Sequence, residues 1–390
     1  MVEKVEHTRV AIVGGGPVGL LLGLQLRSAG IDCRVLERRY EPLVHSRAIG
    51  IHPPALELLQ KFGLAEPLVA RGRQVRRGHV FLGATEVGTL SFDRCPSPFR
   101  FVLSIPQEET ECVIEEHLRA CDPDVLDRGM EVLAVDNGVL GGVELLLGCD
   151  DDARVRLRAE LVVGCDGHDS VVRRAAGVPF VGRSYDEPFV MGDFEESTAF
   201  GDDAALFFHW DGVVESFPLP GGRRRWVVRV ARPVDGEPRA TLARLVAERT
   251  GHRGLLEISC FMTSQFQAQR FLAQKFVCDR LVLAGDAAHV VSPIGGQGMN
   301  LGWLNAALLG RALIALFAKP GAIDPRALHD AYGAPARRRA RQVARRAAFN
   351  TSMGAHRSHP ALRDFLVRLL LLAPFRERLA RQFTMRGLGE

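Results

Sequence analysis

A glycine-rich turn near the amino terminus constrains the fold of this chain more than any other feature of its sequence. Residues 9–13 are short and β-branched, as in a buried parallel strand, and they lead directly into Gly14-x-Gly16-x-x-Gly19. In this spacing the first glycine permits a tight turn, and the second lets the backbone approach a pyrophosphate. The third lets the following helix, predicted over residues 20–29, pack closely on the strand. We therefore expect a strand–turn–helix unit that binds a nucleotide.

A carboxylate stands where such units usually bind a ribose. Residues 32–37 have the pattern of a second strand, which ends in Glu37, 18 residues after Gly19. A carboxylate at this place accepts hydrogen bonds from ribose hydroxyls, and it would repel the additional phosphate of NADP. FAD or NAD therefore fits the turn better. A turn that only packs a helix on a sheet would leave Glu37 unexplained.

Two later acidic motifs favour FAD over NAD. Asp166-Gly167 follows one apolar strand-like run, and Gly285-Asp286 follows another. An acid at the end of a further strand can accept hydrogen bonds from the ribityl hydroxyls of FAD. The alternative, that Asp166 and Asp286 only cap the helices that follow them, stays open at this point.

A loop with three glycines, residues 293–300, follows the second acidic motif and opens a long helix. A helix that starts near Gly298 directs free N–H groups and the positive end of its dipole at an anionic phosphate or at flavin oxygens.

Three motifs occur in a fixed order: the glycine turn with Glu37, then Asp166-Gly167, then Gly285-Asp286. Together they resemble the motifs of the flavin-dependent aromatic hydroxylases, the single-component monooxygenases similar to p-hydroxybenzoate hydroxylase. The resemblance runs from about residue 9 to about residue 320, and the segment 182–185 also resembles the polyketide hydroxylase branch. It implies that Arg47 approaches the flavin or its pyrophosphate and that Gln107 lies beside the ribityl chain. It also implies that the Asp166 motif serves both FAD and NAD(P)H. One departure is Asn305, which stands where the family usually has an acid.

The resemblance implies an α/β fold in which a Rossmann-like FAD-binding domain is discontinuous, over residues 1–72, 106–180 and 271–330. A β-rich substrate-binding domain is expected over residues 73–105 and 181–270, and helices over residues 331–390. The expected cofactor-binding residues are Gly14, Gly16, Pro17, Val18, Gly19, Glu37, Arg38, Arg47, Gln107, Asp166, Gly285, Asp286, Pro293, Gly296, Gly298, Met299 and Asn300. Phe217 and Pro218 are expected to line the substrate cavity.

The reaction implied is the hydroxylation of an aromatic substrate, phenolic or polyketide-like, through a flavin C4a-hydroperoxide. NADPH or NADH would reduce the flavin, and molecular oxygen would be the second substrate. No pattern identifies a catalytic base. The alternatives are a reductase or halogenase of the same fold and a FAD-binding protein without redox activity. Against a halogenase, the three tryptophans do not form the tryptophan-rich segment of those enzymes.

Composition excludes several other classes of protein. The 47% hydrophobic and 25% charged residues are typical of a globular chain. Residues 331–390 carry 13 Arg and 3 acidic residues, but these Arg alternate with apolar residues at helical spacing, which predicts a solvated helix face rather than a nucleic-acid site.

The eight Cys lack metal-ligand spacing, so no metal is expected. No uninterrupted apolar stretch reaches about 20 residues, so we expect no transmembrane segment and a cytoplasmic location. Nothing indicates the oligomeric state.

Overall fold

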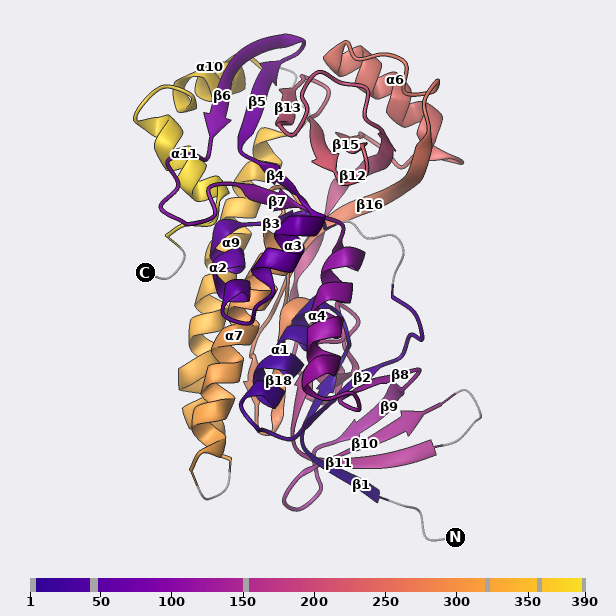
Figure 1. Ribbon diagram of the computed structural model, residues 1–390, viewed down its shortest axis with the longest axis vertical. Coiled ribbons are helices and arrows are strands. Elements are labelled where there is room, and N and C mark those ends of the chain that lie inside the picture. The colour runs from indigo at the N-terminus through magenta and orange to yellow at the C-terminus, as the bar shows by residue number, and fades with distance from the viewer. Residues whose placement is uncertain (1–4, 43–47, 150–153, 320–322, 356–359, 388–390) are drawn as a thin grey trace.

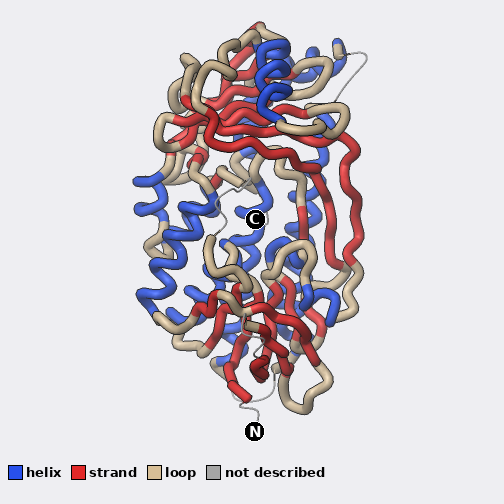
Figure 2. The backbone as a smooth tube through the Cα atoms, turned by 90° about the vertical axis from the view of Figure 1, so that its right-hand side faces the viewer, coloured by secondary structure: helices blue, strands red, loops and turns tan. Residues whose placement is uncertain are grey.

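Two large β-sheets organise the chain, with long helices running between and beside them (Figures 1 and 2). The structure is a computed structural model that describes residues 5–42, 48–149, 154–319, 323–355 and 360–387. We call the sheet that contains the amino-terminal strand the parallel sheet and the other the mixed sheet.

The parallel sheet is built around the strand that precedes the glycine turn. Strand β1 (Val5–Val13) pairs in parallel with β2 (Cys33–Glu37) on one side and with β11 (Arg154–Gly164) on the other. The remaining members are β8 (Leu126–Arg128), β9 (Glu131–Asp136), β10 (Val143–Gly148), β17 (Val277–Cys278) and β18 (Leu281–Leu283). Because β1, β2, β8, β11 and β18 run parallel, their carboxyl ends meet at one edge of the sheet.

Helices α1 (Pro17–Ser28), α4 (Gln107–Cys121) and α7 (Gln297–Phe317) pack side by side near this sheet (Figure 1). Residues 18–26 of α1 are all buried, which explains why this helix is apolar on every face. It begins at Pro17, three residues before the predicted start, because proline is favoured at the first helical position. Among the described residues, α7 is the one helix long and apolar enough to cross a membrane, and 56% of its apolar window is buried inside the fold.

The mixed sheet has the strand order β19-β16-β12-β15-β14-β13-β5-β6. Its members are β5 (Arg77–Leu82), β6 (Thr85–Ser91), β12 (Phe180–Glu195), β13 (Ala204–Phe208), β14 (Val214–Leu219), β15 (Arg223–Arg229), β16 (Cys260–Ala273) and β19 (His289–Val290). Strand β14 pairs antiparallel with β13 and with β15, as expected for a β-rich segment. Alternation gives this sheet two apolar faces. Helix α6 (Pro238–Thr250) covers the face that carries Trp226, whereas Met191 and Val227 lie on the other face.

The remaining elements connect or close these sheets. A small sheet holds β3 (Gly50–Ile51), β4 (Arg73–Val75) and β7 (Val102–Ser104). The short helices are α2 (Pro53–Gln60), α3 (Ala65–Arg71), α5 (Val171–Ala175) and α8 (Pro325–Leu328). A 3₁₀ turn spans Gly285–Ala287 and a π-helical turn spans His329–Gly333.

Three carboxyl-terminal helices, α9 (Ala334–Met353), α10 (Ala361–Leu370) and α11 (Phe375–Phe383), reach from α7 to the edge of the mixed sheet (Figure 1). On α9, Ala336, Ala340 and Val343 are buried whereas Arg338 and Arg341 are exposed, so the expected solvated basic face is confirmed. The domain boundaries given above remain predictions.

Candidate functional site

A cavity of about 1310 Å³ lies where the carboxyl edge of the parallel sheet, the uncovered face of the mixed sheet and the carboxyl-terminal helices meet. Typical ligand pockets have volumes of about 300–1,000 Å³, so this cavity is large enough for a cofactor and a second molecule together. Its walls come from segments far apart in the sequence, and they join the glycine turn to an apolar chamber.

Most of the expected site residues line this cavity. They are Gly14, Gly16, Pro17, Val18, Glu37, Arg38, Gln107, Asp166, Gly285, Asp286, Pro293, Gly296, Gly298 and Met299, together with Phe217 of the expected substrate site. Arg47 lies outside the described residues. Gly19, Asn300 and Pro218 do not line the cavity.

The glycines of the turn have different structural roles. Gly14 has a φ of +107°, and a Cβ there would lie 2.4 Å from the carbonyl oxygen of Cys165, so only glycine lets β1 and β11 meet so closely. A Cβ on Gly19 would lie 2.0 Å from the oxygen of Gly14, so Gly19 lets α1 pack on the turn instead of contacting a ligand. A Cβ on Gly16 would meet nothing within 4 Å, which leaves open space on the cavity side of the turn.

Glu37 is buried at the end of β2 and is held in the charged state. Its Oε2 accepts a hydrogen bond from the Gly15 amide at 2.7 Å, and its Oε1 accepts from the backbone and Nε of Arg39 at 3.0 and 2.9 Å. Burial alone would raise its pKa, but these hydrogen bonds outweigh burial and lower the pKa of Glu37. The carboxylate is thus an ionised acceptor beside the turn, as the ribose-binding prediction requires.

Asp166 has a divided role at the end of β11. Its Oδ2 accepts hydrogen bonds from the amides of Val171 and Val172 at 2.7 and 3.3 Å, so the capping alternative holds for this oxygen. The other oxygen, Oδ1, is buried and has no hydrogen-bond partner among the described residues. Burial raises the pKa of Asp166. A buried acceptor without a partner on the wall of a cavity indicates a ligand that donates hydrogen bonds.

The loop that opens α7 is held in place by Asn300, which does not line the cavity, and by His52, which does. Fully buried Asn300 accepts a hydrogen bond from the His52 amide at 2.8 Å and donates to the oxygens of Gly50 and Gly296 at 2.9 and 2.8 Å. Asn300 therefore positions the loop rather than lining the cavity. His52 Nε2 lies 2.9 Å from the oxygen of Gly295, and burial lowers the pKa of His52 to about 4, which leaves its ring neutral.

Asp286 lies beside this loop and opens into the cavity. The side chain is exposed on the cavity side, and partial removal from water by the surrounding protein raises the pKa of Asp286 to about 6. At neutral pH the group is still mostly ionised and can accept hydrogen bonds from hydroxyl groups.

The segment that departs from the family pattern packs the long helix on the glycine turn. Trp303 is fully buried and its indole nitrogen donates to the oxygen of Pro17 at 2.9 Å. Asn305 contacts His289 Nε2 at 3.1 Å and accepts from Arg339 at 3.2 Å. Asn305 thus accepts a hydrogen bond from the charged guanidinium of Arg339 on α9, and it does not line the cavity.

Sequence reasoning missed much of the chamber wall. The carboxyl-terminal helices contribute Phe349, Asn350, Met353, Val367, Leu370, Leu379 and Phe383, and the mixed sheet contributes Glu215 and Arg225. Apolar pairs four residues apart, such as Phe349 with Met353 and Leu379 with Phe383, are a signal in the sequence for apolar helix faces. Nothing in the sequence shows what those faces cover.

The residues of the cavity near the glycine turn and near the amino end of α7 fit FAD. The open side of Gly16 leaves room for a pyrophosphate, and ionised Glu37 can accept from a ribose. The unpartnered Asp166 Oδ1 can accept from a polyol chain, and the amino end of α7 offers N–H groups to an anion.

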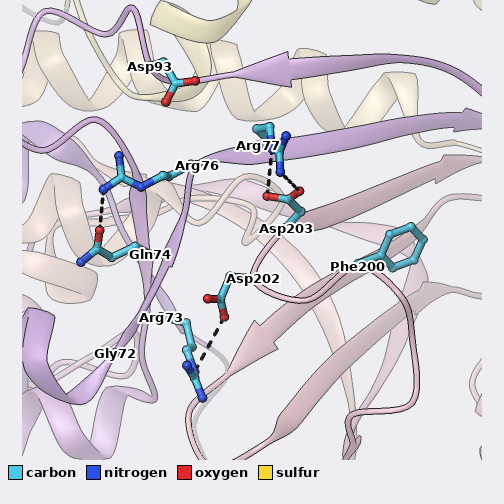
Figure 3. A pocket seen from close by; sticks show the side chains of 9 residues that line it. All are labelled: Gly72, Arg73, Gln74, Arg76, Arg77, Asp93, Phe200, Asp202 and Asp203. Carbon is cyan, nitrogen blue, oxygen red and sulfur yellow. Dashed lines mark hydrogen bonds and ion pairs between the residues drawn. The ribbon is translucent and has the colours of Figure 1, made fainter.

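A second pocket, of about 550 Å³, is lined by nine residues, several of them from β4 and the start of β5 (Figure 3). Its charged side chains contact one another: Arg77 pairs with Asp203 at 3.1 Å and Arg73 with Asp202 at 3.8 Å. We assign no ligand to it, because these opposite charges already neutralise each other.

Comparison with known proteins agrees with this geometry. The uncharacterised aromatic compound monooxygenase YhjG of Bacillus subtilis is 33% identical over 326 residues, which are 81% of this chain and 62% of that protein. Rifampicin monooxygenase of Streptomyces venezuelae is 33% identical over 320 residues, 78% of this chain and 64% of that protein. The chain thus spans less than two thirds of the length of these relatives.

Among solved structures, p-nitrophenol 4-monooxygenase PnpA from Pseudomonas putida superposes with a TM-score of 0.88 at 23% identity, covering 97% of this chain and 98% of that one. At this identity the superposition shows a shared fold. The family model described as "FAD binding domain" matches residues 7–347, which include both the glycine turn of residues 14–19 and the loop of residues 293–300. This protein therefore belongs to the FAD-binding domain family.

Proposed function

We propose that this protein is an FAD-dependent monooxygenase that consumes NADPH or NADH and molecular oxygen to hydroxylate an aromatic substrate. The observation that carries the proposal is the single continuous cavity, in which residues suited to FAD share one space with an apolar chamber. The names of the two relatives, an aromatic compound monooxygenase and a rifampicin monooxygenase, support the same reaction class.

In this proposal the chain's own residues bind and orient. Glu37 holds the adenosine ribose, Asp166 and Asp286 hold the ribityl hydroxyls, and the amino end of α7 faces the anionic groups. Asn300 keeps the loop of residues 293–300 in place below. FAD, when bound, supplies the redox chemistry that couples the reduced nicotinamide and oxygen to hydroxylation.

The chamber excludes water and favours a large aromatic substrate. Phe217, Phe266, Phe349, Met353 and Phe383 lie on its wall, from both the mixed sheet and the carboxyl-terminal helices. A dry chamber limits unproductive loss of the oxidising equivalent to water, and its size favours a polycyclic phenol over a single ring. We also propose a cytoplasmic location, since the nicotinamide donor is a cytosolic metabolite.

The test is the visible absorbance spectrum of the purified protein, recorded without oxygen before and after addition of NADPH or NADH. We expect flavin bands that bleach, and that bleach faster when a suitable phenol is present. Flavin bands that neither nucleotide bleaches would contradict the proposal and favour a halogenase supplied by a separate reductase or a role without redox chemistry. Bleaching without oxygen-dependent hydroxylation of any phenol would favour a reductase.

A further inference from the structure

Glu215 is a buried carboxyl group on the face of the mixed sheet that lines the cavity. It lies on β14, opposite Leu206 of β13 and Val227 of β15, and it is only 8% exposed. Strand alternation places Phe217, two residues later, on the same face, and both side chains line the cavity.

No hydrogen bond or ion pair satisfies this carboxyl group within the described part of the chain. The neighbouring acid on this face, Asp193, differs because Arg225 binds both of its oxygens. Buried ionisable groups in proteins are normally paired, so an unpaired one that opens into a cavity indicates a partner outside the protein. Burial also raises the pKa of Glu215 to about 7, so both charge states are available near neutral pH.

Two arginines lie on the same face of the sheet as Glu215, and both make contacts with other groups, so that burial is the one cause that shifts the pKa of Glu215. Strand β13 has no titratable residue, and β15 carries Arg225 and Arg229 on the same face. Arg225 is engaged by Asp193, and Arg229 donates to the oxygen of Thr351 at 2.6 Å.

Other elements near β14 bring charges that are also engaged. Strand β7 has no titratable residue, and Arg73 of β4 pairs with Asp202 at 3.8 Å. His79, which lines the same cavity, lies 3.3 Å from Asp203. The nearest neighbours of Glu215 on this face of the sheet are apolar, namely Leu206 and Val227 on the adjacent strands, Val213 just before β14 and Phe217 on β14, and all four line the cavity.

We propose that Glu215 contacts the substrate and accepts a hydrogen bond from its aromatic hydroxyl group, so that the site selects neutral polycyclic phenols and rejects aromatic carboxylates. The proposal rests on the function proposed above and names the substrate class of the same site. A hydroxyl group provides the donor that the carboxylate lacks. A substrate carboxylate would instead place a second negative charge near Glu215, where Arg225 is already bound by Asp193.

The test measures binding of two fluorescent probes with the same three fused rings, a phenanthrol and a phenanthrenecarboxylate, to the FAD-loaded protein. No nicotinamide nucleotide is added. Affinity is measured at about pH 6 and about pH 8, on the two sides of the Glu215 pKa. We expect the preference for the phenanthrol over the carboxylate to rise roughly tenfold between these pH values, or about 1.4 kcal/mol.

Three variants make this result specific. Glu215→Gln should lose most of the pH dependence of the preference, because the amide has no charge to gain, whereas Asp286, whose pKa is about 6, still titrates in the lower part of this pH range. Glu215→Asp keeps the charge and should still reject the carboxylate at high pH, although the shorter side chain weakens phenanthrol binding. Glu66→Gln, at an exposed position on α3, is the control and should behave like the wild type.

A preference whose pH dependence survives in Glu215→Gln would overturn the inference, as would failure of the wild type to bind either probe. The outcome is separable from that of the proposed function, since binding is measured without flavin reduction. If the flavin bleaches normally but the preference for the phenanthrol is the same in the wild type and in Glu215→Gln, only this inference is refuted. A Glu215-dependent preference in a protein whose flavin is never reduced would remove the monooxygenase proposal alone.

Discussion

The buried ion pair on the mixed sheet should contribute more to stability than any exposed pair of similar geometry. Asp193 accepts from Arg225 Nε at 2.6 Å and from Nη2 at 2.8 Å, and the two side chains are 9% and 4% exposed. Asp193→Asn keeps the shape but removes a negative charge that binds a buried guanidinium through two hydrogen bonds. Breaking such a pair costs about 3–5 kcal/mol, because the lost attraction no longer offsets the removal of the guanidinium from water.

The expected shift in melting temperature follows from the size of the protein. Unfolding entropy of roughly 2.1 cal/mol/K per residue amounts to about 0.8 kcal/mol/K for this chain, so Asp193→Asn should lower Tm by about 4–6 °C. The assay is a thermal melt followed by circular dichroism, with the same saturating FAD concentration for every variant.

The matched control is Glu248→Gln, which removes an exposed pair with Arg244 at 2.8 Å, where the side chains are 53% and 59% exposed. Such a pair contributes about 0.5 kcal/mol or less, so its loss should lower Tm by less than about 1 °C. Equal shifts for the two variants would refute the argument, because they would show that the Arg225 guanidinium remains well solvated through the cavity.

Three further results are expected. Glu37→Ala should weaken FAD binding at least about tenfold in a fluorescence titration, since hydrogen bonds to charged groups contribute about 1.5–3 kcal/mol, and unchanged affinity would exclude Glu37 from the ribose site. Gly14→Ala should yield little folded protein in a soluble-expression and circular dichroism assay, because its Cβ would lie 2.4 Å from the Cys165 oxygen at a φ of +107°; a normal melt would mean that β1 and β11 can separate. Because the pKa of Glu215 is raised from 4.5 to about 7 on folding, the folded state binds the extra proton, and wild-type stability should fall as pH rises through this interval. Glu215→Gln should therefore gain about 3 °C in Tm over the wild type between about pH 5 and pH 8, and a constant difference would contradict the raised pKa.

The residues around the glycine turn could be predicted from the sequence because each is required by the backbone conformation or by the spacing of neighbouring elements. Gly14 must adopt a positive φ directly after a strand, and Glu37 ends the next strand at a distance set by one intervening helix. Both requirements arise within one contiguous strand–helix–strand unit, so the spacing of Gly14, Gly19 and Glu37 in the sequence is enough to predict them. The acids of the two later motifs, Asp166 and Asp286, could be placed on the same wall because the carboxyl ends of parallel strands meet at one edge.

The chamber was far less predictable, because its composition depends on contacts between distant segments. Strand β13 pairs in parallel with β5, more than a hundred residues earlier, and no local pattern records that pairing. Pro218 shows the same difficulty. It adjoins Phe217 in the sequence, yet side chains alternate along β14, so Phe217 lines the cavity and Pro218 does not.

The amino-acid sequence by itself determined the nucleotide-binding turn, the acids at the ends of the parallel strands and the solvated face of α9. Each depends on backbone conformation, strand ends or helical spacing within a short stretch of chain. Only the tertiary structure decided that α9, α10 and α11 help enclose the cavity, that Asp193 pairs with Arg225, and that Glu215 has no partner among the described residues. Those properties depend on which faces and strands meet across the fold, and a one-residue change of register would reverse them without changing any local pattern.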